Sequence, residues 1–166
     1  MNIQINKLKR RKEGKTDYRK RLKTLVVDKP RVIIRKSLNN ILIQLIGYDP
    51  KGDIVICSAH SSELDSLNWK FNKGNIPSSY LTGFLFGNKL IKKKVDKEGI
   101  ILDIGLNPSI KGSRIYAALK GIIDSGVNMN HSKEIFPSDD RIKGKHISNE
   151  IEEEINTLKK KIGEIK

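Results

Sequence analysis

The spacing of hydrophobic residues changes along the chain, and the change predicts the order of its elements. Three short apolar runs come first, at residues 32–34, 41–46 and 53–59. In the second run Ile41, Ile43 and Leu45 fall on one face of an extended strand. The segment that follows it, YDPKGD, has the residues of a type I turn, with Asp49 in its first position and Gly52 in its last. Three strands with tight connections predict an antiparallel meander.

A long helix is predicted next, because the apolar spacing becomes helical. Asn75 is a candidate N-cap, and Pro77 is tolerated in the first turn. The apolar positions are Leu81, Phe84, Leu85, Ile91 and Val95. Gly83 and Gly87 lie inside this helix and each weakens it by roughly 1 kcal/mol relative to alanine. We therefore expect them to permit close packing against the sheet or a partner.

The remaining elements complete an α/β pattern. Ser62 is a candidate cap for a short helix that holds Leu64, Leu67 and Trp69. The run GIILDIG, at residues 99–105, is apolar on both faces and predicts a central strand. A further helix is expected between Ser113 and Gly126. The order is β-β-β-α-α-β-α, which predicts a mixed α/β fold with a mainly antiparallel central sheet and helices packed on it.

The C-terminal residues predict one more helix. Its apolar positions are Ile151, Ile155, Leu158 and Ile162, spaced by four, three and four residues. So narrow a stripe fits two interpretations, because it can pack on the parent domain or on a neighbouring molecule. The predicted organisation is a basic arm at 1–24, an α/β core at 25–130, and a tail with a C-terminal helix at 131–166.

Charge is concentrated at the N-terminus. The chain has a net charge of +14, and residues 1–24 contribute ten lysines and arginines against two acidic residues. Residues 25–130 add fifteen against nine, and residues 131–166 are balanced at eight against eight. A basic segment beside a mildly basic domain is typical of proteins that bind nucleic acid. A solvated tail is the alternative, but solubility alone requires neither Gly14 nor Tyr18 within the run.

The sequence predicts a soluble intracellular protein. Cys57 is the single cysteine, so no disulfide can form within the chain, as suits a reducing compartment. No run approaches the 18 or so apolar residues of a membrane span. The N-terminus also lacks the apolar region of a secretory signal.

Catalytic patterns are weak. His60 lies among Ser58, Ser61, Ser62 and Asp65, but no serine has the surroundings of a nucleophile elbow. Three scattered histidines and one cysteine do not form a zinc site, and GFLFGNK lacks the spacing of a phosphate-binding P-loop. We therefore expect no enzymatic activity and no cofactor.

One enzymatic alternative is a ribonuclease-H-like nuclease, whose opening order of elements is similar. Its two-metal chemistry needs clustered carboxylates, one of them on the first strand. Here Asp103 offers one ligand and Asp53 a poor second. The first strand supplies Arg31, Arg35 and Lys36, which would repel the metal.

Residues suited to binding phosphate recur outside the arm. KGSR, at residues 111–114, places cations, a hydroxyl and backbone N–H groups at a helix start, where an anion is favoured, although an ordinary helix cap has the same residues. Tyr18 and Trp69 are candidates for stacking on bases, with burial the alternative for Trp69. On residues alone, the chain is an RNA- or DNA-binding domain with a basic arm.

Six motifs narrow this interpretation. RRKEGKTDYRKRL, AHSSEL, GNIPSSYLTG, LDIGL, KGSRIYAALKGIIDSG and IFPSDDRIKGKHI occur in this order. Together, over residues 9–149, they resemble the large-subunit ribosomal protein family that binds 5S ribosomal RNA, number eighteen in the prokaryotic naming, in its archaeal form. The resemblance implies a structural protein of the cytoplasmic ribosome that attaches 5S rRNA to the large-subunit rRNA in the central protuberance. It also implies neighbouring ribosomal proteins as partners, including the other 5S-binding protein, number five.

The resemblance also implies which residues contact RNA. In the arm they are Arg10, Arg11, Lys12, Gly14, Lys15, Thr16, Tyr18, Arg19, Arg21 and Lys23. In the core and tail they are Arg35, Lys36, Ser37, His60, Ser61, Lys111, Ser113, Arg114, Arg141, Lys143 and His146. The arm is then expected to be disordered until RNA orders it.

Residues 150–166 extend beyond the resemblance, and we expect their helix to dock on an adjacent ribosomal protein or on RNA. A general RNA-binding or chaperone protein remains the alternative function.

Overall fold

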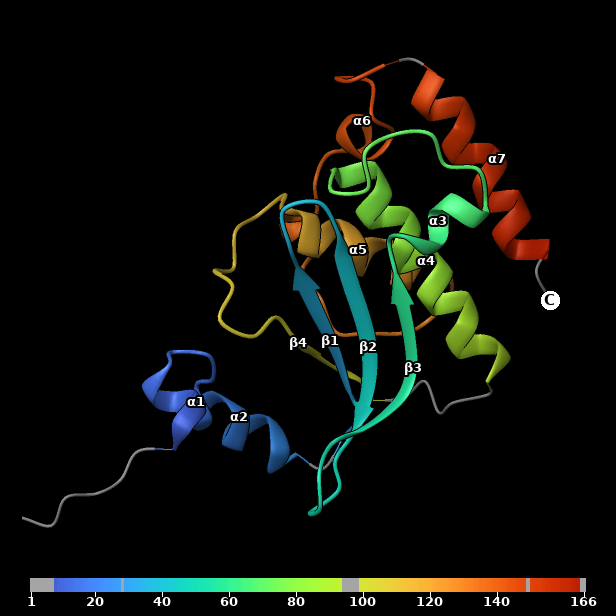
Figure 1. Cartoon of the computed structure of the whole chain (residues 1–166). Coiled ribbons are helices and arrows are strands. Elements are labelled where there is room, and N and C mark those ends of the chain that lie inside the picture. The colour runs from blue at the N-terminus through green and yellow to red at the C-terminus, as the bar shows by residue number, and fades with distance from the viewer. Residues whose placement is uncertain (1–7, 28, 94–98, 149, 165–166) are drawn as a thin grey trace, which may run out of the picture.

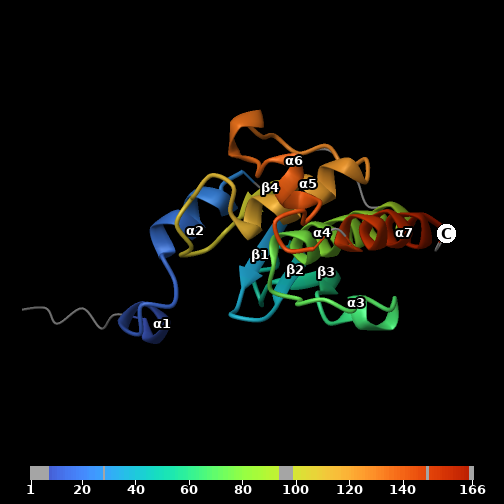
Figure 2. The ribbon, with the colours of Figure 1, turned by 90° about the horizontal axis from the view of Figure 1, so that it is seen from above.

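The fold has two layers, a four-stranded sheet and helices that cover one of its faces (Figures 1 and 2). The structure is a computed structural model and describes residues 8–27, 29–93, 99–148 and 150–164. The strands are β1 (Arg31–Lys36), β2 (Ile41–Gly47), β3 (Ile54–His60) and β4 (Ile101–Asp103), in the order β3-β2-β1-β4. The two long helices on the sheet are α4 (Ile76–Lys92) and α5 (Arg114–Asp124). The mixed α/β fold predicted from the sequence is confirmed.

The first three strands form the predicted antiparallel meander. Ile41, Ile43 and Leu45 all lie in the core, at most 1% exposed, because alternate residues of β2 face the helices. The turn after β2 is also as predicted, since the Gly52 N–H donates to the Asp49 carbonyl at 2.9 Å.

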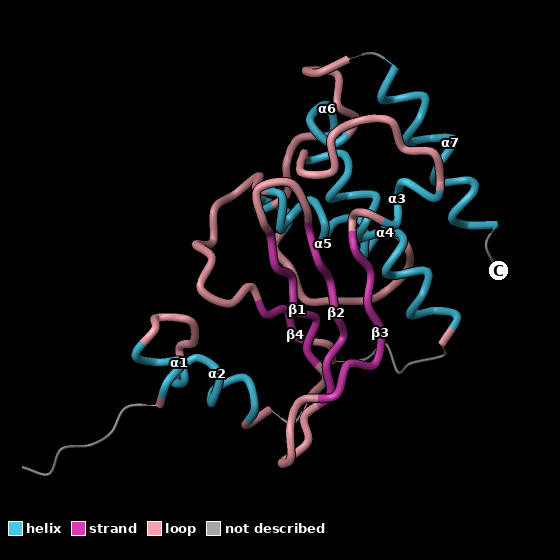
Figure 3. The backbone as a smooth tube through the Cα atoms, in the orientation of Figure 1, coloured by secondary structure: helices cyan, strands magenta, loops and turns pink. Residues whose placement is uncertain are grey.

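The fourth strand differs from the prediction. β4 is not central: it lies at the edge of the sheet beside β1, to which it is parallel (Figure 3). Its three residues are only partly buried. The apolar run at 99–105 has a different cause, because Ile100 precedes the strand and is 6% exposed, packed in the main core.

α4 and α5 pack unusually close together. The glycines of α4 correctly predicted a close contact, but the contact is with α5 and not with the sheet or a partner. A Cβ atom added at Gly83 would lie 2.0 Å from the Ala118 carbonyl oxygen, and one at Gly121 would lie 2.1 Å from the Tyr80 carbonyl oxygen. The predicted N-cap is present, since the Asn75 side chain accepts from the Ser78 N–H at 2.8 Å. Val95, expected in this helix, lies outside the described residues.

The C-terminal helix α7 (Glu150–Glu164) packs on its own domain. Its stripe of Ile151, Ile155, Leu158 and Ile162 is at most 2% exposed. It lies against α4 and joins a second core cluster with residues such as Leu64 of α3 (Glu63–Ser66) and Ile142 of α6 (Asp139–Ile142). The expectation that this stripe docks on a neighbouring protein or RNA is therefore wrong, because its apolar residues are already covered.

The remaining regular segment of the tail is a short 3-10 helix, Lys133–Ile135. Among the residues that the structure describes, no helix has both the length and the apolar character needed to cross a lipid bilayer.

Candidate nucleic-acid interface

The basic arm forms two short helices, α1 (Lys9–Lys12) and α2 (Tyr18–Leu25), beside the β4 edge of the sheet (Figure 1). Gly14 has a φ of +64° in the turn between them, a conformation that glycine adopts without steric cost. The Asp17 carboxylate caps α2 by accepting from the backbone N–H groups of Arg19 and Lys20, at 3.0 and 3.1 Å. The part of the arm that the structure describes, residues 8–24, thus has regular structure, whereas the sequence indicated disorder.

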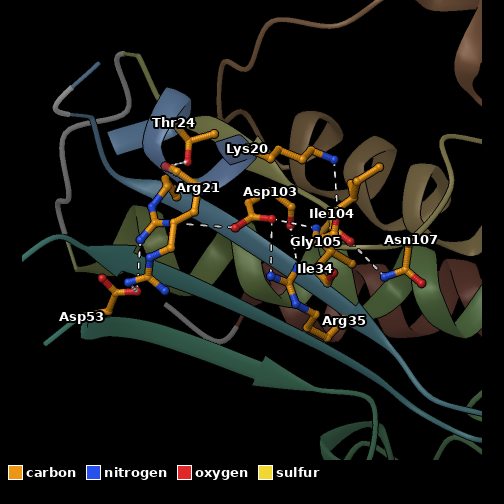
Figure 4. Close-up of polar contacts among 11 residues, drawn as sticks. Lys20, Arg21, Thr24, Ile34, Arg35, Asp53, Asp103, Ile104, Gly105 and Asn107 are labelled. Atoms are coloured by element: carbon orange, nitrogen blue, oxygen red, sulfur yellow. Dashed lines mark hydrogen bonds and ion pairs between the residues drawn. The ribbon is translucent and has the colours of Figure 1, made fainter. Parts of the chain in front are cut away.

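Two side chains of α2 join the arm to the domain (Figure 4). The Arg21 guanidinium pairs with the Asp53 carboxylate at 3.0 Å. The Lys20 ammonium donates to the Gly105 carbonyl at 3.1 Å. Asp53 lies directly before β3 and Gly105 follows β4, so α2 is joined to loops beside both edge strands of the sheet.

Asp53 is also the partner of an arginine in the sheet. The Arg31 side chain is only 2% exposed, lies 3.1 Å from Asp53 and lies 3.7 Å from Asp103. Burying a guanidinium is costly unless it is paired, and these two carboxylates supply the pairing. Asp103 pairs in turn with Arg35, at 3.3 Å. The five side chains Arg21, Asp53, Arg31, Asp103 and Arg35, named here the arginine ladder, have a net charge of +1.

The ladder forms one wall of a cleft between the arm and the sheet edge. The cleft has a volume of about 380 Å³ and is lined by residues of the arm, β1, β4 and the loop after β4. Its cations include Arg10, Lys15 and Lys20 from the arm in addition to the three ladder arginines. Ile33, Leu102 and Leu106 contribute apolar surface. These six cations outnumber the three carboxylates of the lining, Asp17, Asp53 and Asp103, and a concave site with excess positive charge attracts phosphate groups.

Apart from Arg21, which pairs with Asp53, the cations predicted in the arm divide into two sets. The Arg10 guanidinium donates to the Thr16 hydroxyl at 3.0 Å and the Lys15 ammonium pairs with Glu13 at 2.9 Å, so these residues hold the turn between the helices. The other set consists of exposed side chains that make no hydrogen bond or ion pair with another described residue: Arg11, Lys12, Arg19 and Lys23. Because no described carboxylate neutralises them, this second set is the strongest candidate for contact with phosphates.

A second group of predicted residues gathers around the β1–β2 hairpin. The Ser37 hydroxyl is exposed and donates to the Asn40 carbonyl. The Arg114 guanidinium donates to the carbonyls of Leu38 and Gly74, at 3.2 and 2.8 Å, so part of its capacity is used inside the domain. Lys36, at the end of β1, is half-buried.

Ser61 is buried and does not contribute to the protein surface. Its side chain is fully buried, accepts from the Ile41 N–H at 3.1 Å and donates to the Asn40 side chain at 3.0 Å. The prediction that Ser61 contacts RNA is therefore corrected: it fixes the hairpin against β3. His60 is half-buried, with its Nδ1 atom 2.6 Å from the Ser62 hydroxyl.

At the start of α5 the predicted phosphate contacts are only partly present. The Lys111 ammonium is exposed but pairs with Glu134 at 3.2 Å. The Ser113 hydroxyl lacks a hydrogen-bond partner among the described residues although its oxygen is buried, so Ser113 is an N-cap residue whose side chain does not cap.

The predicted residues of the tail form a third group around α6. Arg141 and His146 are exposed. The Lys143 ammonium pairs with Glu152 of α7 at 2.9 Å. The hydrogen bond from this ammonium is the main reason that the pKa of the Glu152 carboxyl is lowered. This group is electrostatically weaker than the arm, because acidic residues lie among its cations.

The two aromatic candidates differ in accessibility. Trp69 is 4% exposed and packs edge-on against Phe71, with the ring centroids 5.4 Å apart. Burial is therefore the correct interpretation of Trp69. Tyr18, the first residue of α2, is half-buried and retains part of its ring at the surface.

The carboxylates considered for a nuclease have other roles. Asp53 and Asp103 each contact Arg31, and each has a second arginine partner. Guanidinium groups occupy the space around them, where a two-metal mechanism needs divalent cations. Within the described residues there is also no grouping of three or more histidine, cysteine, aspartate or glutamate side chains suited to a metal ion.

Sequence reasoning missed several contributors to the cleft, among them the charged residues Lys20, Arg31, Asp53 and Asp103. Lys20 lies within the basic run, but nothing in the sequence distinguishes it from its neighbours. Arg31 is the first residue of the mainly apolar strand β1, and the sequence does not identify the partner of its charge. The aspartates are distant in sequence, and only the fold brings them together.

Comparison with known families supplies a further finding. A family model described as ribosomal large subunit proteins 60S L5 and 50S L18 matches residues 3–100. The match covers more than half of the 166-residue chain and includes the arm, β1, β2, β3 and α4.

Proposed function

Because the chain belongs to the family of ribosomal large-subunit proteins 60S L5 and 50S L18, we propose that it binds 5S ribosomal RNA and attaches it to the large-subunit rRNA. Family membership itself makes the chain a structural protein of the large ribosomal subunit that binds ribosomal RNA. The choice of 5S rRNA, the position in the central protuberance and contact with the other 5S-binding protein are the proposed part.

The observation that supports the proposal most directly is the docked basic arm. Four of its exposed cations that have no described partner, Arg11, Lys12, Arg19 and Lys23, lie next to a cationic cleft of about 380 Å³. Lysine and arginine side chains held in this way neutralise phosphates and release condensed counterions, which provides most of the affinity for a polyanion.

Selectivity for one RNA requires shape as well as charge, because phosphate contacts alone carry no sequence information. The hairpin group around Ser37 and Arg114 and the tail group around Arg141 and His146 are two further candidate contact surfaces. We propose residues 1–24 as the principal RNA-binding arm, residues 25–130 as the core that fixes its orientation, and residues 131–166 as a tail that widens the contact surface.

The test is equilibrium binding of the full chain to 5S rRNA, with transfer RNA as competitor, across a series of salt concentrations. A dedicated 5S-binding protein should prefer 5S rRNA by roughly 10³-fold or more, the lower end of the range for specific protein–DNA complexes. Equal competition by transfer RNA would instead favour a general RNA-binding or chaperone protein.

The contribution of the arm is measured with a matched pair of variants. Arg11→Gln with Lys12→Gln removes two exposed arm cations, and Lys160→Gln with Lys161→Gln removes two exposed cations of α7. The arm variant should flatten the dependence of log K on log salt by about 0.7–0.9 for each phosphate that the protein no longer neutralises. The α7 variant should leave the slope unchanged. Equal slopes for both variants would mean that Arg11 and Lys12 of the arm do not contact RNA phosphates.

A further inference from the structure

We propose that Asp53 is a positioning residue for RNA binding, which docks the arm on the sheet before RNA arrives and so forms the cleft in advance. One oxygen of its carboxylate, Oδ2, accepts from Arg21 of the arm at 3.0 Å and from Arg31 of β1 at 3.1 Å. A single carboxylate therefore joins the arm to the sheet. The inference rests on the proposed function only in requiring that the arm contacts RNA.

The charge of Asp53 has the wrong sign for a direct contact. An aspartate in a cleft that receives phosphates repels them, since like charges a few ångströms apart interact unfavourably. Its presence there is explained by what it does to the arginines. It lowers the repulsion between Arg21 and Arg31 and holds both in fixed positions, at the cost of one negative charge.

Little else holds α2 in place. Among the described residues, two side-chain hydrogen bonds join α2 to the domain, Arg21 with Asp53 and Lys20 with the Gly105 carbonyl. Apolar packing adds little, because no side chain of α2 is fully buried: Leu25 is half-buried and Leu22 is 63% exposed. Removal of the Asp53 contact should therefore release the arm.

The loop after β4 completes the docking site. The Asp103 carboxylate accepts from the Gly105 N–H at 2.7 Å, and Gly105 has a φ of +64°. This conformation presents the Gly105 carbonyl to Lys20. The motif LDIGL is thereby explained as the second docking point of the arm.

A docked arm strengthens binding by preorganisation. When only a fraction of molecules holds the binding conformation, the apparent Kd rises by the inverse of that fraction. An arm that is docked about 1–10% of the time would weaken RNA binding about 10- to 100-fold. Charge alone predicts the opposite, because removing a carboxylate should tighten binding to a polyanion. The two explanations therefore differ in sign.

The experiment compares Asp53→Asn with Asp49→Asn in the full chain. Asp49 is four residues away, lies in the adjacent turn and contacts no arginine among the described residues, so it controls for the removal of one negative charge. Hydrogen exchange of the α2 amides in the free protein reports docking, and binding to 5S rRNA across salt concentrations reports function. Asp53→Glu tests rescue.

The proposal expects Asp53→Asn to accelerate α2 exchange and to weaken binding about 10- to 100-fold at low salt. Asp49→Asn should bind equally or slightly more tightly, and Asp53→Glu should recover most of the affinity. Unchanged exchange in α2, or tighter binding by Asp53→Asn, would overturn the proposal.

A second pair of variants controls for a general loss of stability, because Asp53→Asn also removes a partner of the buried Arg31. Arg21→Gln and Arg19→Gln remove the same charge from α2, but only Arg21 is paired with Asp53. Faster α2 exchange in Arg21→Gln alone, at equal thermal stability of the domain, supports docking by Asp53, and equal exchange in both contradicts it. If wild type fails to prefer 5S rRNA over transfer RNA, the proposed function fails, while the ratio of variant to wild type on one RNA still decides this inference.

Discussion

Replacing Gly83 with alanine should destabilise the domain although alanine is the better helix former. The added Cβ would lie 2.0 Å from the Ala118 carbonyl oxygen and 2.8 Å from its carbonyl carbon. Both are main-chain atoms of α5, so the clash is relieved only if one helix moves. Overpacking of a core costs about 1–3 kcal/mol, and helix propensity returns about 1 kcal/mol. Because main chain must shift here, we expect a net loss of about 2 kcal/mol.

The matched control is Gly163→Ala in α7. Gly163 is also helical and exposed, and a Cβ atom there meets nothing within 4 Å. Helix propensity then acts alone and should stabilise the protein by up to about 0.5–1 kcal/mol. Urea unfolding followed by circular dichroism measures both free energies of unfolding. For a chain of this size the loss at Gly83 corresponds to a Tm about 4–8 °C lower. Equal or greater stability of Gly83→Ala would refute the close contact between α4 and α5.

The packing and the charges lead to three further predictions. Leu158→Ala, in the buried stripe of α7, should lower the free energy of unfolding by about 2–5 kcal/mol in urea titration, and an effect as small as that of exposed Thr157→Ala would contradict packing of α7 on α4. Burial of Tyr80 raises the pKa of its hydroxyl above the ordinary value of about 10, and the hydrogen bond to Asp124 raises it further. The folded state then retains the proton longer than the unfolded state, so this contribution to stability is present below about pH 10 and is lost as the pH rises further. Phenolate absorbance should show a tyrosine that titrates only on unfolding, and Tyr80→Phe should remove that step. Gly105→Ala should release the arm in the hydrogen-exchange assay, because alanine is strained at a φ of +64° and its Cβ would lie 2.8 Å from the Arg35 guanidinium carbon. The matched variant Gly14→Ala is equally strained in φ but has open space around it, so arm docking should survive there.

Local patterns predicted the meander and the two long helices because their determinants are close in sequence. The period of two in Ile41, Ile43 and Leu45, the turn at Asp49 and the cap at Asn75 are each decided within a few residues. Gly83 was informative for a related reason, since an interior glycine in a helix is costly and therefore indicates close contact. These elements needed no knowledge of distant residues.

Other features depend on what the fold brings together. The apolar run at 99–105 predicted a central strand, but burial of Ile100 beside the edge strand produces the same pattern. The stripe of α7 was equally compatible with a partner surface or its own domain, and the position of α4 decided between them. The polar motif around Ser61 is typical of a surface, whereas its hydroxyl satisfies the buried N–H of Ile41. The arginine ladder could not be predicted for the same reason, because Asp53 and Asp103 are far apart in the sequence.

The ladder also explains how a strongly basic arm can be attached to a basic domain. Arg21, Arg31 and Arg35 would repel one another if brought together alone, and Arg31 could not be buried. Two aspartates reduce the group from three positive charges to one, so the arm docks while its cations Arg11, Lys12, Arg19 and Lys23 stay exposed. The side chains of Arg21 and Arg35 are 38% and 40% exposed, so their pairing weakens with salt as surface ion pairs do. Salt therefore acts twice on RNA binding, on the phosphate contacts and on the docked fraction. Asp53→Asn removes the second effect, so in the range of high salt where the wild-type arm also undocks, the affinities of the two proteins should converge.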